Sequence, residues 1–576
     1  MSGTTNAYTS SNDEGVNLGQ RSKELAEYHK QELKPKGLRA YVRLSPNAVA
    51  HTPKSLSMQS FRFVLRWGFF FPQSCRVSFW AHFFKGDPMN RRRFLWQGLC
   101  SSLPFLANAN LPKLVAALPV SKPNNVDLKT FVRGLTGTAF RPGDPNYERL
   151  RKVYAAKYDA HPALVVHPVN LQDLQATLSF VRSNGLPLAI RCGGHSYAGY
   201  STCEGGVVLE MSGFRGIAVG VEKMSARVGG GALCGAVEIE TARAGVATAL
   251  GQCPSVGVGG YLLGGGVGPL MSKYGLGCDN ILGATVVLAD GRQVKASAHE
   301  NPDLFWAIRG GGGNFGVVTE FEVALHPVSK VFAGNITLES ADPREFLQAF
   351  QKLVSSAPDA LTLIAVVSAE PNHKPQIEIQ ACYIGEQGAG ESALAPIRHH
   401  PAVVHDTVQL RSYLELEQMV PANIPPSYEE HFSGFFGELD DRRIEILAKA
   451  FLSAPLPVNC FLIHLHGAVT RVPVDATPFP LRRVGIGCDI AAYWKPPDGQ
   501  QAAREWIEAL KTTLPVDEDG NYVNVMEREG ETASGTHMAP TTYGFSTSRR
   551  ATTLAMCSLS TRTYGPHDGS RSKFVV

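Results

Sequence analysis

Two side chains with nucleophilic chemistry, His195 and Cys253, lie beside glycine runs. Residues 191–197 read RCGGHSY, and residues 251–268 read GQCPSVGVGGYLLGGGVG. Glycine has no Cβ, so consecutive amides in such runs can turn inward and form a concave anion site. The two segments therefore predict a large phosphate-bearing cofactor held by backbone amides, which could also be bonded to His195 and Cys253.

Composition narrows the class of protein. The 576 residues are enough for more than one domain and a large core. Hydrophobic residues at 44% and charged residues at 18% are typical of a soluble globular protein. A net charge of +4, without a basic stripe, gives no indication of nucleic-acid binding. Eleven cysteines without a CxxC pair argue against a zinc ribbon, and no metal site is expected.

Residues 89–109, MNRRRFLWQGLCSSLPFLANA, combine a basic start, an apolar stretch and a small-residue cleavage site. This order predicts a twin-arginine-type signal and hence a periplasmic or extracellular protein; a basic patch before a short buried helix is the alternative. Because a signal lies at the N-terminus, we expect Met89 to be the true start and 1–88 to be a non-native upstream extension. Arginines interrupt the aromatic-rich stretch 61–84, which is too broken to span a membrane.

From about Ser121 the chain predicts short alternating strands and helices. Asn170 is the expected cap of a helix over about 171–183. The strands are expected over 163–168, 186–191, 206–210, 225–229, 284–291 and 317–325, and the helices over 171–183, 233–244 and 301–308.

The pattern Gly311-x-Gly313-x-x-Gly316 matches the dinucleotide-binding fingerprint in form only. A strand is predicted directly after it, at 317–325, where a Rossmann unit requires a helix. A Rossmann fold is therefore rejected. After about Pro327 glycine becomes rarer and longer strands and helices alternate to about Asp498, which predicts a second domain.

Taken together, several segments resemble the berberine-bridge-enzyme-like branch of the vanillyl-alcohol oxidase superfamily of FAD-linked oxidoreductases. The resemblance implies an α+β fold: a PCMH-type FAD-binding domain of two subdomains over 121–328, and a substrate-binding domain over 329–500 with an antiparallel sheet covered by helices. A berberine-bridge-like element would follow over 501–531. The matching segments are 162–168, 191–197, 253–260 with 264–268, 277–280 and 301–316.

In this family the histidine matching His195 bonds the flavin 8α carbon, and the cysteine matching Cys253 bonds flavin C6. The resemblance thus implies FAD attached through both residues, although a turn-capping histidine and a buried thiol are the alternatives for each alone. The other residues expected to bind FAD are Arg191, Gly193, Gly194, Ser196, Tyr197, Val256, Gly257, Gly259, Gly260, Gly264, Gly265, Gly268, Asp279, Asn280, Gly313, Asn314, Gly316, Val318 and Asn524.

The expected reaction is hydride transfer from an alcohol or sugar hemiacetal carbon to the flavin, with molecular oxygen as acceptor and H2O2 as product. A small residue at Val256 favours oxygen access in the family. The expected partners are a small substrate (a sugar, alcohol or amine) and oxygen. A dehydrogenase with another acceptor, or a flavin- or carbohydrate-binding protein without turnover, is the alternative.

The substrate side matches the family more loosely. Residues 464–468, HLHGA, resemble a family strand beneath the substrate pocket, although strand histidines are more often structural. Residues 521–525, NYVNV, resemble a family element near the flavin whose fourth position can hold a catalytic tyrosine, here Val525. Tyr522 remains the candidate catalytic residue, with strand packing as the alternative, and the general base is unassigned.

The end of the chain departs from the family, whose members finish with a segment resembling AYGxNYxRLxxLKxxYDPxNxF. From the third base of the Thr536 codon, synonymous codons can be chosen so that another frame reads AYGPNYVRLLDLKTRYDPGNVFS. We therefore expect a frameshift close to Glu531, which makes 532–576 a non-native tail.

Overall fold

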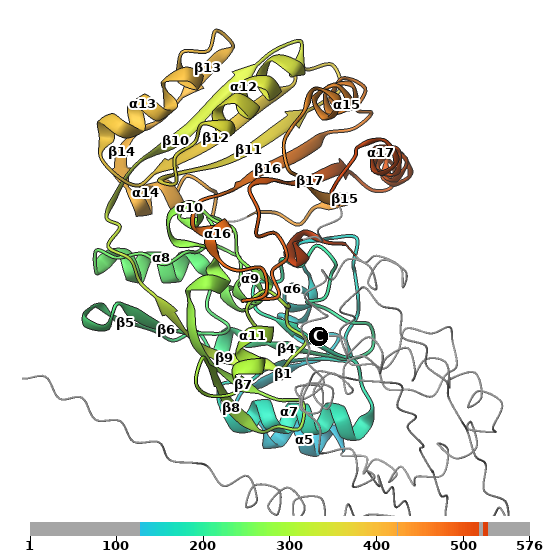
Figure 1. The fold of residues 1–576 in the computed structure, drawn as a ribbon. Coiled ribbons are helices and arrows are strands. Elements are labelled where there is room, and N and C mark those ends of the chain that lie inside the picture. The colour runs from blue at the N-terminus through green and yellow to red at the C-terminus, as the bar shows by residue number, and fades with distance from the viewer. Residues whose placement is uncertain (1–126, 423, 518–521, 528–576) are drawn as a thin grey trace, which may run out of the picture. The chain divides into compact units, whose positions relative to one another are not determined.

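The computed structural model describes residues 127–422, 424–517 and 522–527 (Figure 1). All of them belong to one compact unit of the chain, Ser121–Val576. The predicted export signal, the predicted extension before it and the predicted altered tail lie outside the described residues. No helix in the described part of the chain is long and apolar enough to cross a membrane.

A four-stranded sheet carries the first glycine-rich segment at the end of β3. Its order is β1-β2-β4-β3, with β2 and β3 parallel to β4 and β1 antiparallel to β2. As predicted, Asn170 caps α7 by accepting a hydrogen bond from the Asp173 amide at 2.8 Å. The elements are β1 (Thr138–Phe140), β2 (Leu164–His167), β3 (Leu188–Arg191), β4 (Val207–Glu210), α5 (Leu128–Gly134), α6 (Tyr147–Arg151) and α7 (Leu171–Asn184).

A five-stranded antiparallel sheet, ordered β5-β6-β9-β7-β8, carries the second segment between its strands. The fingerprint glycines are followed by strand β9, which confirms the rejection of a Rossmann unit. The strands are β5 (Ile217–Gly220), β6 (Ser225–Gly229), β7 (Ile281–Val287), β8 (Gln293–Ser297) and β9 (Val317–Ala324). The helices are α8 (Cys234–Arg243), α9 (Val258–Gly264), α10 (Met271–Tyr274) and α11 (Pro302–Ala307), with 3-10 turns η2 (Met211–Gly213), η3 (Val221–Lys223) and η4 (Gly277–Asn280).

An eight-stranded antiparallel sheet follows, ordered β13-β10-β12-β11-β16-β17-β15 with β14 beside β10. Together with the two smaller sheets it gives the α+β fold that was expected. The strands are β10 (Lys330–Glu339), β11 (Leu361–Ala369), β12 (Gln376–Tyr383), β13 (Val403–Asp406), β14 (Gln409–Ser412), β15 (Tyr428–Phe436), β16 (Val458–Leu465) and β17 (Gly485–Trp494). The other elements are α12 (Pro343–Ser355), α13 (Gln387–Arg398), α14 (Tyr413–Glu417), α15 (Asp441–Leu452), α16 (Ala468–Arg471), α17 (Gln500–Thr513) and η5 (Val523–Val525).

Helices α12, α15 and α17 cover one face of the large sheet (Figure 1). Phe346, Leu447 and Ile507 from these helices pack in one hydrophobic cluster with Ile379 and Ile490 from the strands. Burial of this apolar surface is the main stabilising term for the sheet. Because successive side chains of a strand alternate between faces, the neighbours of Ile490 and of its equivalents point to the opposite face.

Candidate active site

The two glycine-rich segments cross at Gly193 and Gly257. A Cβ atom on Gly193 would lie 2.4 Å from the Gly257 nitrogen, and one on Gly257 would lie 2.3 Å from the Gly193 nitrogen. No side chain fits at such distances, so the crossing requires glycine on both segments. It fixes the loop after β3 against the loop before α9.

The hydroxyl of Ser255 connects the two predicted anchors. Its oxygen lies 3.0 Å from His195 Nε2 and 3.4 Å from Cys253 Sγ. The fold therefore brings the histidine and the cysteine together, as the sequence predicts. Ser255 itself was missed, and its only signal was its place two residues after Cys253.

His195 is neutral at pH 7. Burial, and then the positive charge of Arg191, lower the pKa of His195 to about 4. With Nε2 facing Ser255, Nδ1 has no hydrogen-bond partner among the described residues. A neutral imidazole with a free nitrogen can act as a nucleophile.

Cys253 is one of two partly exposed cysteines in the described ranges, and the other is Cys192. Burial raises the pKa of Cys192 to about 11, which keeps that thiol protonated and unreactive. The remaining described cysteines are buried, as expected for small hydrophobic side chains. Cys253 is therefore the thiol that a ligand beside His195 can reach.

Aromatic rings lead from His195 to the large sheet. Tyr154 stacks on His195 with ring centroids 5.3 Å apart, and Tyr197 lies 5.8 Å from Tyr154. Tyr197 in turn stacks on His431 of β15 at 4.4 Å. Tyr197 was predicted only as a cofactor residue, and in the structure its ring also connects the first glycine-rich loop to the sheet.

A buried charged triad lies at the end of this path. His431 Nδ1 is 3.0 Å from Asp489 Oδ1, and His431 Nε2 is 3.0 Å from Glu429 Oε1. Burial alone lowers the pKa of His431, but Asp489 and Glu429 raise it by more, to about 10. His431 is therefore a cation at neutral pH, held between two carboxylates.

Strand register assembles the triad. β15 pairs antiparallel with β17, and Glu429, His431 and Ser433 lie opposite Tyr493, Ala491 and Asp489 respectively. Odd-numbered residues of both strands share the face that the helices leave uncovered. Sequence reasoning missed all three members of the triad because no motif contains them.

Tyr522 lies against the second glycine-rich segment. Its hydroxyl oxygen accepts hydrogen bonds from the Gly266 amide at 3.1 Å and from Asn524 Nδ2 at 3.0 Å. Asn524 also donates to the Tyr261 carbonyl at 3.1 Å, and it packs on Gly264, where a Cβ atom would lie 2.0 Å from its Oδ1. Residues 523–525 form a 3-10 turn and not a strand, and the Tyr522 ring packs against a hydrophobic cluster that includes Phe479. Its role as a catalytic residue remains a prediction.

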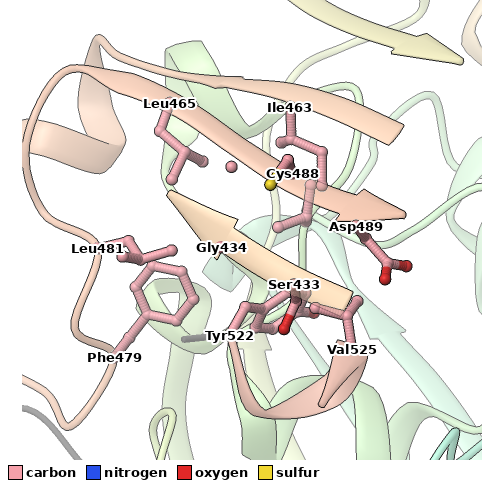
Figure 2. Close-up of a pocket in the computed structure, with 12 residues that line it drawn as sticks. Ser433, Gly434, Ile463, Leu465, Phe479, Leu481, Cys488, Asp489, Tyr522 and Val525 are labelled. Atoms are coloured by element: carbon pink, nitrogen blue, oxygen red, sulfur yellow. The ribbon is translucent and has the colours of Figure 1, made fainter. Parts of the chain in front are cut away.

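A pocket separates Tyr522 from the triad (Figure 2). Strands β15, β16 and β17 supply one side, and the loop with Phe479 and the turn η5 supply the other. Asp489 and Tyr522 both line it. Val525 lines it as well.

Other predicted cofactor residues support the two loops. The guanidinium of Arg191 lies 3.7 Å from Glu210, and Ser196 Oγ accepts a hydrogen bond from the Tyr200 amide at 3.2 Å. Gly194 has a φ of 78°, and Gly265 has one of 136°. In the second loop, Cβ atoms on Gly259 and Gly268 would clash with the carbonyls of Gly230 and Leu250, whereas Val256 is partly exposed and Gly260 has nothing within 4 Å of its Cβ position.

Among the described residues, the cofactor residues predicted between 279 and 318 form no hydrogen bond with His195, Ser255 or Cys253. Asp279 forms a buried bidentate ion pair with Arg482, at 2.7 and 2.8 Å, and Asn280 lies 2.6 Å from His326. In the loop before β9, Gly313 is partly buried, Asn314 is exposed and Gly316 has a φ of 143°, while Val318 is buried in β9. Their contact with FAD remains a prediction.

His464 and His466 stack on each other at 4.0 Å and do not line the pocket. His466 contacts Ser272 Oγ at 3.4 Å and the Pro358 carbonyl at 3.3 Å. Burial lowers the pKa of His464 to about 3, which keeps it neutral. His464 lies on β16 and His466 directly after it, and both side chains are buried.

The sequence of this chain is similar to those of known flavoproteins. Residues 162–297 match the FAD binding domain family. The chain is 34% identical over 290 residues to (R)-6-hydroxynicotine oxidase of Paenarthrobacter nicotinovorans, covering 49% of this chain and 62% of that protein. It is 36% identical over 368 residues to Berberine bridge enzyme-like 4 of Arabidopsis thaliana, covering 59% and 67%.

Solved structures of two oxidases have a fold similar to that of this chain. 6-Hydroxy-D-nicotine oxidase from Arthrobacter nicotinovorans superposes with a TM-score of 0.66 at 27% identity, covering 71% of this chain and 93% of that one. Glucooligosaccharide oxidase from Acremonium strictum, whose FAD is 6-S-cysteinyl and 8α-N1-histidyl, shares the fold with a TM-score of 0.65 at 22% identity, covering 73% and 96%.

The fold and the paired glycine-rich loops define an FAD-dependent oxidoreductase. The chain belongs to the berberine-bridge-enzyme-like family of FAD-linked oxidoreductases, which confirms the family and the cofactor expected from the sequence.

Proposed function

We propose that this protein is an oxidase whose FAD is covalently bound through both His195 and Cys253. The observation that carries the proposal is the convergence of the two side chains on Ser255, at 3.0 and 3.4 Å. The crossing of the loops at Gly193 and Gly257 and the open space beside Gly260 fit a large planar group held close to the backbone. The two linkages in glucooligosaccharide oxidase support the same pairing of residue types.

Bound FAD would supply the acceptor for a hydride from an alcohol or hemiacetal carbon, and molecular oxygen would be the oxidant that gives H2O2. The residues of the chain have two tasks in this proposal. His195 and Cys253 hold the cofactor in place, and Asp489 accepts the proton of the substrate hydroxyl. His431, positively charged and 3.0 Å away, fixes the orientation of the Asp489 carboxylate.

The test is acid precipitation of the purified full chain, followed by absorption spectroscopy of the pellet and the supernatant. Flavin absorbance that stays in the pellet supports covalent attachment, and flavin that is released contradicts it. Reoxidation of the reduced protein in air, compared with a dye as acceptor, separates an oxidase from a dehydrogenase. H2O2 formed in proportion to the substrate consumed is the expected result.

We further propose export by the twin-arginine route, which carries folded proteins with their cofactors. The support is the order of charge, apolar stretch and Ala-x-Ala in residues 89–109. Replacing Arg91 and Arg92 by lysine should retain the protein in the cytoplasm of the native host. Unchanged fractionation of that variant contradicts the route.

A further inference from the structure

Ser255 is held in place by a tight turn in the second glycine-rich segment. The Val256 amide donates to the Cys253 carbonyl at 3.1 Å, which closes a turn with Pro254 at its second position. A Cβ atom on Gly193 would lie 2.6 Å from the Ser255 carbonyl oxygen, so the first glycine-rich loop packs directly on this turn. The backbone that carries the Ser255 side chain is therefore fixed by both loops.

The orientation of the His195 ring depends on this side chain. Tyr154 stacks on the imidazole with ring centroids 5.3 Å apart, which fixes the plane of the His195 ring. A flip of the ring about the Cβ–Cγ bond keeps this plane but exchanges both nitrogens with ring carbons. The contact of Nε2 with Ser255 Oγ at 3.0 Å selects one of the two orientations.

The same contact determines which nitrogen of His195 carries the proton. Nδ1 has no hydrogen-bond partner among the described residues, whereas Nε2 has an acceptor in Ser255 Oγ. A proton on Nε2 therefore leaves fewer polar groups unpaired in this partly buried site. Because a hydroxyl group can accept and donate at the same time, Ser255 can accept from Nε2 and donate its own proton to Cys253 Sγ at 3.4 Å.

We propose that Ser255 is a positioning residue for flavin attachment, which holds the proton of His195 on Nε2 and so leaves the lone pair of Nδ1 free to bond the flavin 8α carbon. This inference rests on the covalent attachment proposed above. The new N–C bond replaces one C–H bond of the 8α methyl group. The methyl proton and the Nε2 proton are released, the second through the Ser255 hydroxyl. Two electrons pass with these protons to molecular oxygen, which leaves as H2O2.

Variants with a single possible attachment site separate this role from support of the loop. In a Cys253→Ala background only His195 can bind the flavin covalently, and adding Ser255→Ala should lower the attached flavin by on the order of tenfold. In a His195→Ala background only Cys253 can bind it, and adding Ser255→Ala should leave most of the attachment in place. Ser255→Thr keeps the hydroxyl group and should restore attachment at His195. Mass spectrometry of peptides from the full-length variants measures the fraction that carries flavin at each residue.

The outcomes distinguish this inference from the function on which it rests. Wild-type peptides without flavin would contradict covalent attachment, and the role of Ser255 with it. Wild-type peptides joined by a flavin, together with full attachment at His195 in the Ser255→Ala variant, would overturn only the role of Ser255. Equal losses at His195 and Cys253, or a loss in Ser255→Thr as large as that in Ser255→Ala, would show that the hydroxyl does not position His195 and would also overturn that role.

Discussion

Between Arg191 and Gly268 the chain fixes its functional groups by close contact of backbone with backbone, whereas on the large sheet it fixes them by strand register. In the first region the groups that meet, His195 and Cys253, each lie in a glycine-rich segment of a few residues. In the second, His431 and Asp489 come from strands separated by two helices and another strand. The proposed attachment of the cofactor therefore depends on two glycine-rich segments that cross, and the proposed substrate chemistry depends on strand pairing across a long stretch of chain.

The largest effect is expected from breaking the backbone crossing. Gly193→Ala would place a methyl group 2.4 Å from the Gly257 nitrogen, so the loops must separate and His195 must move away from Cys253. Nearly complete loss of covalent flavin is expected, measured as absorbance in the acid pellet. Gly134→Ala is the control, because its Cβ position has nothing within 4 Å. Full flavin incorporation in Gly193→Ala would show that the crossing is not needed.

A strand substitution should separate chemistry from cofactor binding. Asp489→Asn keeps the size of the side chain but cannot accept the substrate proton, so the rate of flavin reduction should fall by about 10²–10⁴-fold. Covalent flavin content should remain that of the wild type, since Asp489 is on the sheet. Stopped-flow reduction under anaerobic conditions measures the rate. An unchanged rate would mean that another group is the base.

The triad should also give the protein an alkaline stability limit. The pKa of His431 is raised from 6.5 to about 10, so its stabilising contribution is fully present below pH 6.5 and is lost as the pH rises through 10. His431→Gln removes the cation between two buried carboxylates and should cost about 3–5 kcal/mol at pH 7. Denaturation midpoints from pH 6 to 10.5 check this. The alkaline decrease should be weaker in His431→Gln, and an equal decrease in both proteins would contradict the assignment.

The smallest effect is expected on the rate at which oxygen reoxidises the reduced flavin. The resemblance to the family gives Val256 a role in oxygen access, and Val256 is partly exposed in the loop that carries Cys253. Val256→Leu should slow reoxidation by oxygen while leaving reduction by substrate unchanged. The two half-reactions are measured separately by stopped flow. A change in reduction alone would place Val256 in substrate binding instead.

The sequence predicted much of the first region. The strands and helices that were predicted between 163 and 325 lie within a few residues of their expected positions, because periodicity and the Asn170 cap are local signals. The short elements β5, β8, α9 and α10 were not predicted. His195 and Cys253 could be paired only through the resemblance to a family, since residue spacing does not reveal that two loops cross.

The substrate side could not be predicted in the same way. Glu429, His431 and Asp489 become neighbours only when β15 pairs with β17, and no local pattern marks a charged residue that will be buried. The HLHGA segment drew attention to His464 and His466 instead, although these rings pack away from the pocket. Tyr522 was found because its motif is local, and the residues that face it across the pocket were not.

The most direct test of covalent attachment is mass spectrometry of proteolytic fragments from the full-length protein. Cleavage should yield one fragment in which the peptide containing His195 and the peptide containing Cys253 are joined by a single flavin. His195→Ala and Cys253→Ala should each leave the flavin on one peptide only. Recovery of both wild-type peptides at their unmodified masses would contradict the account.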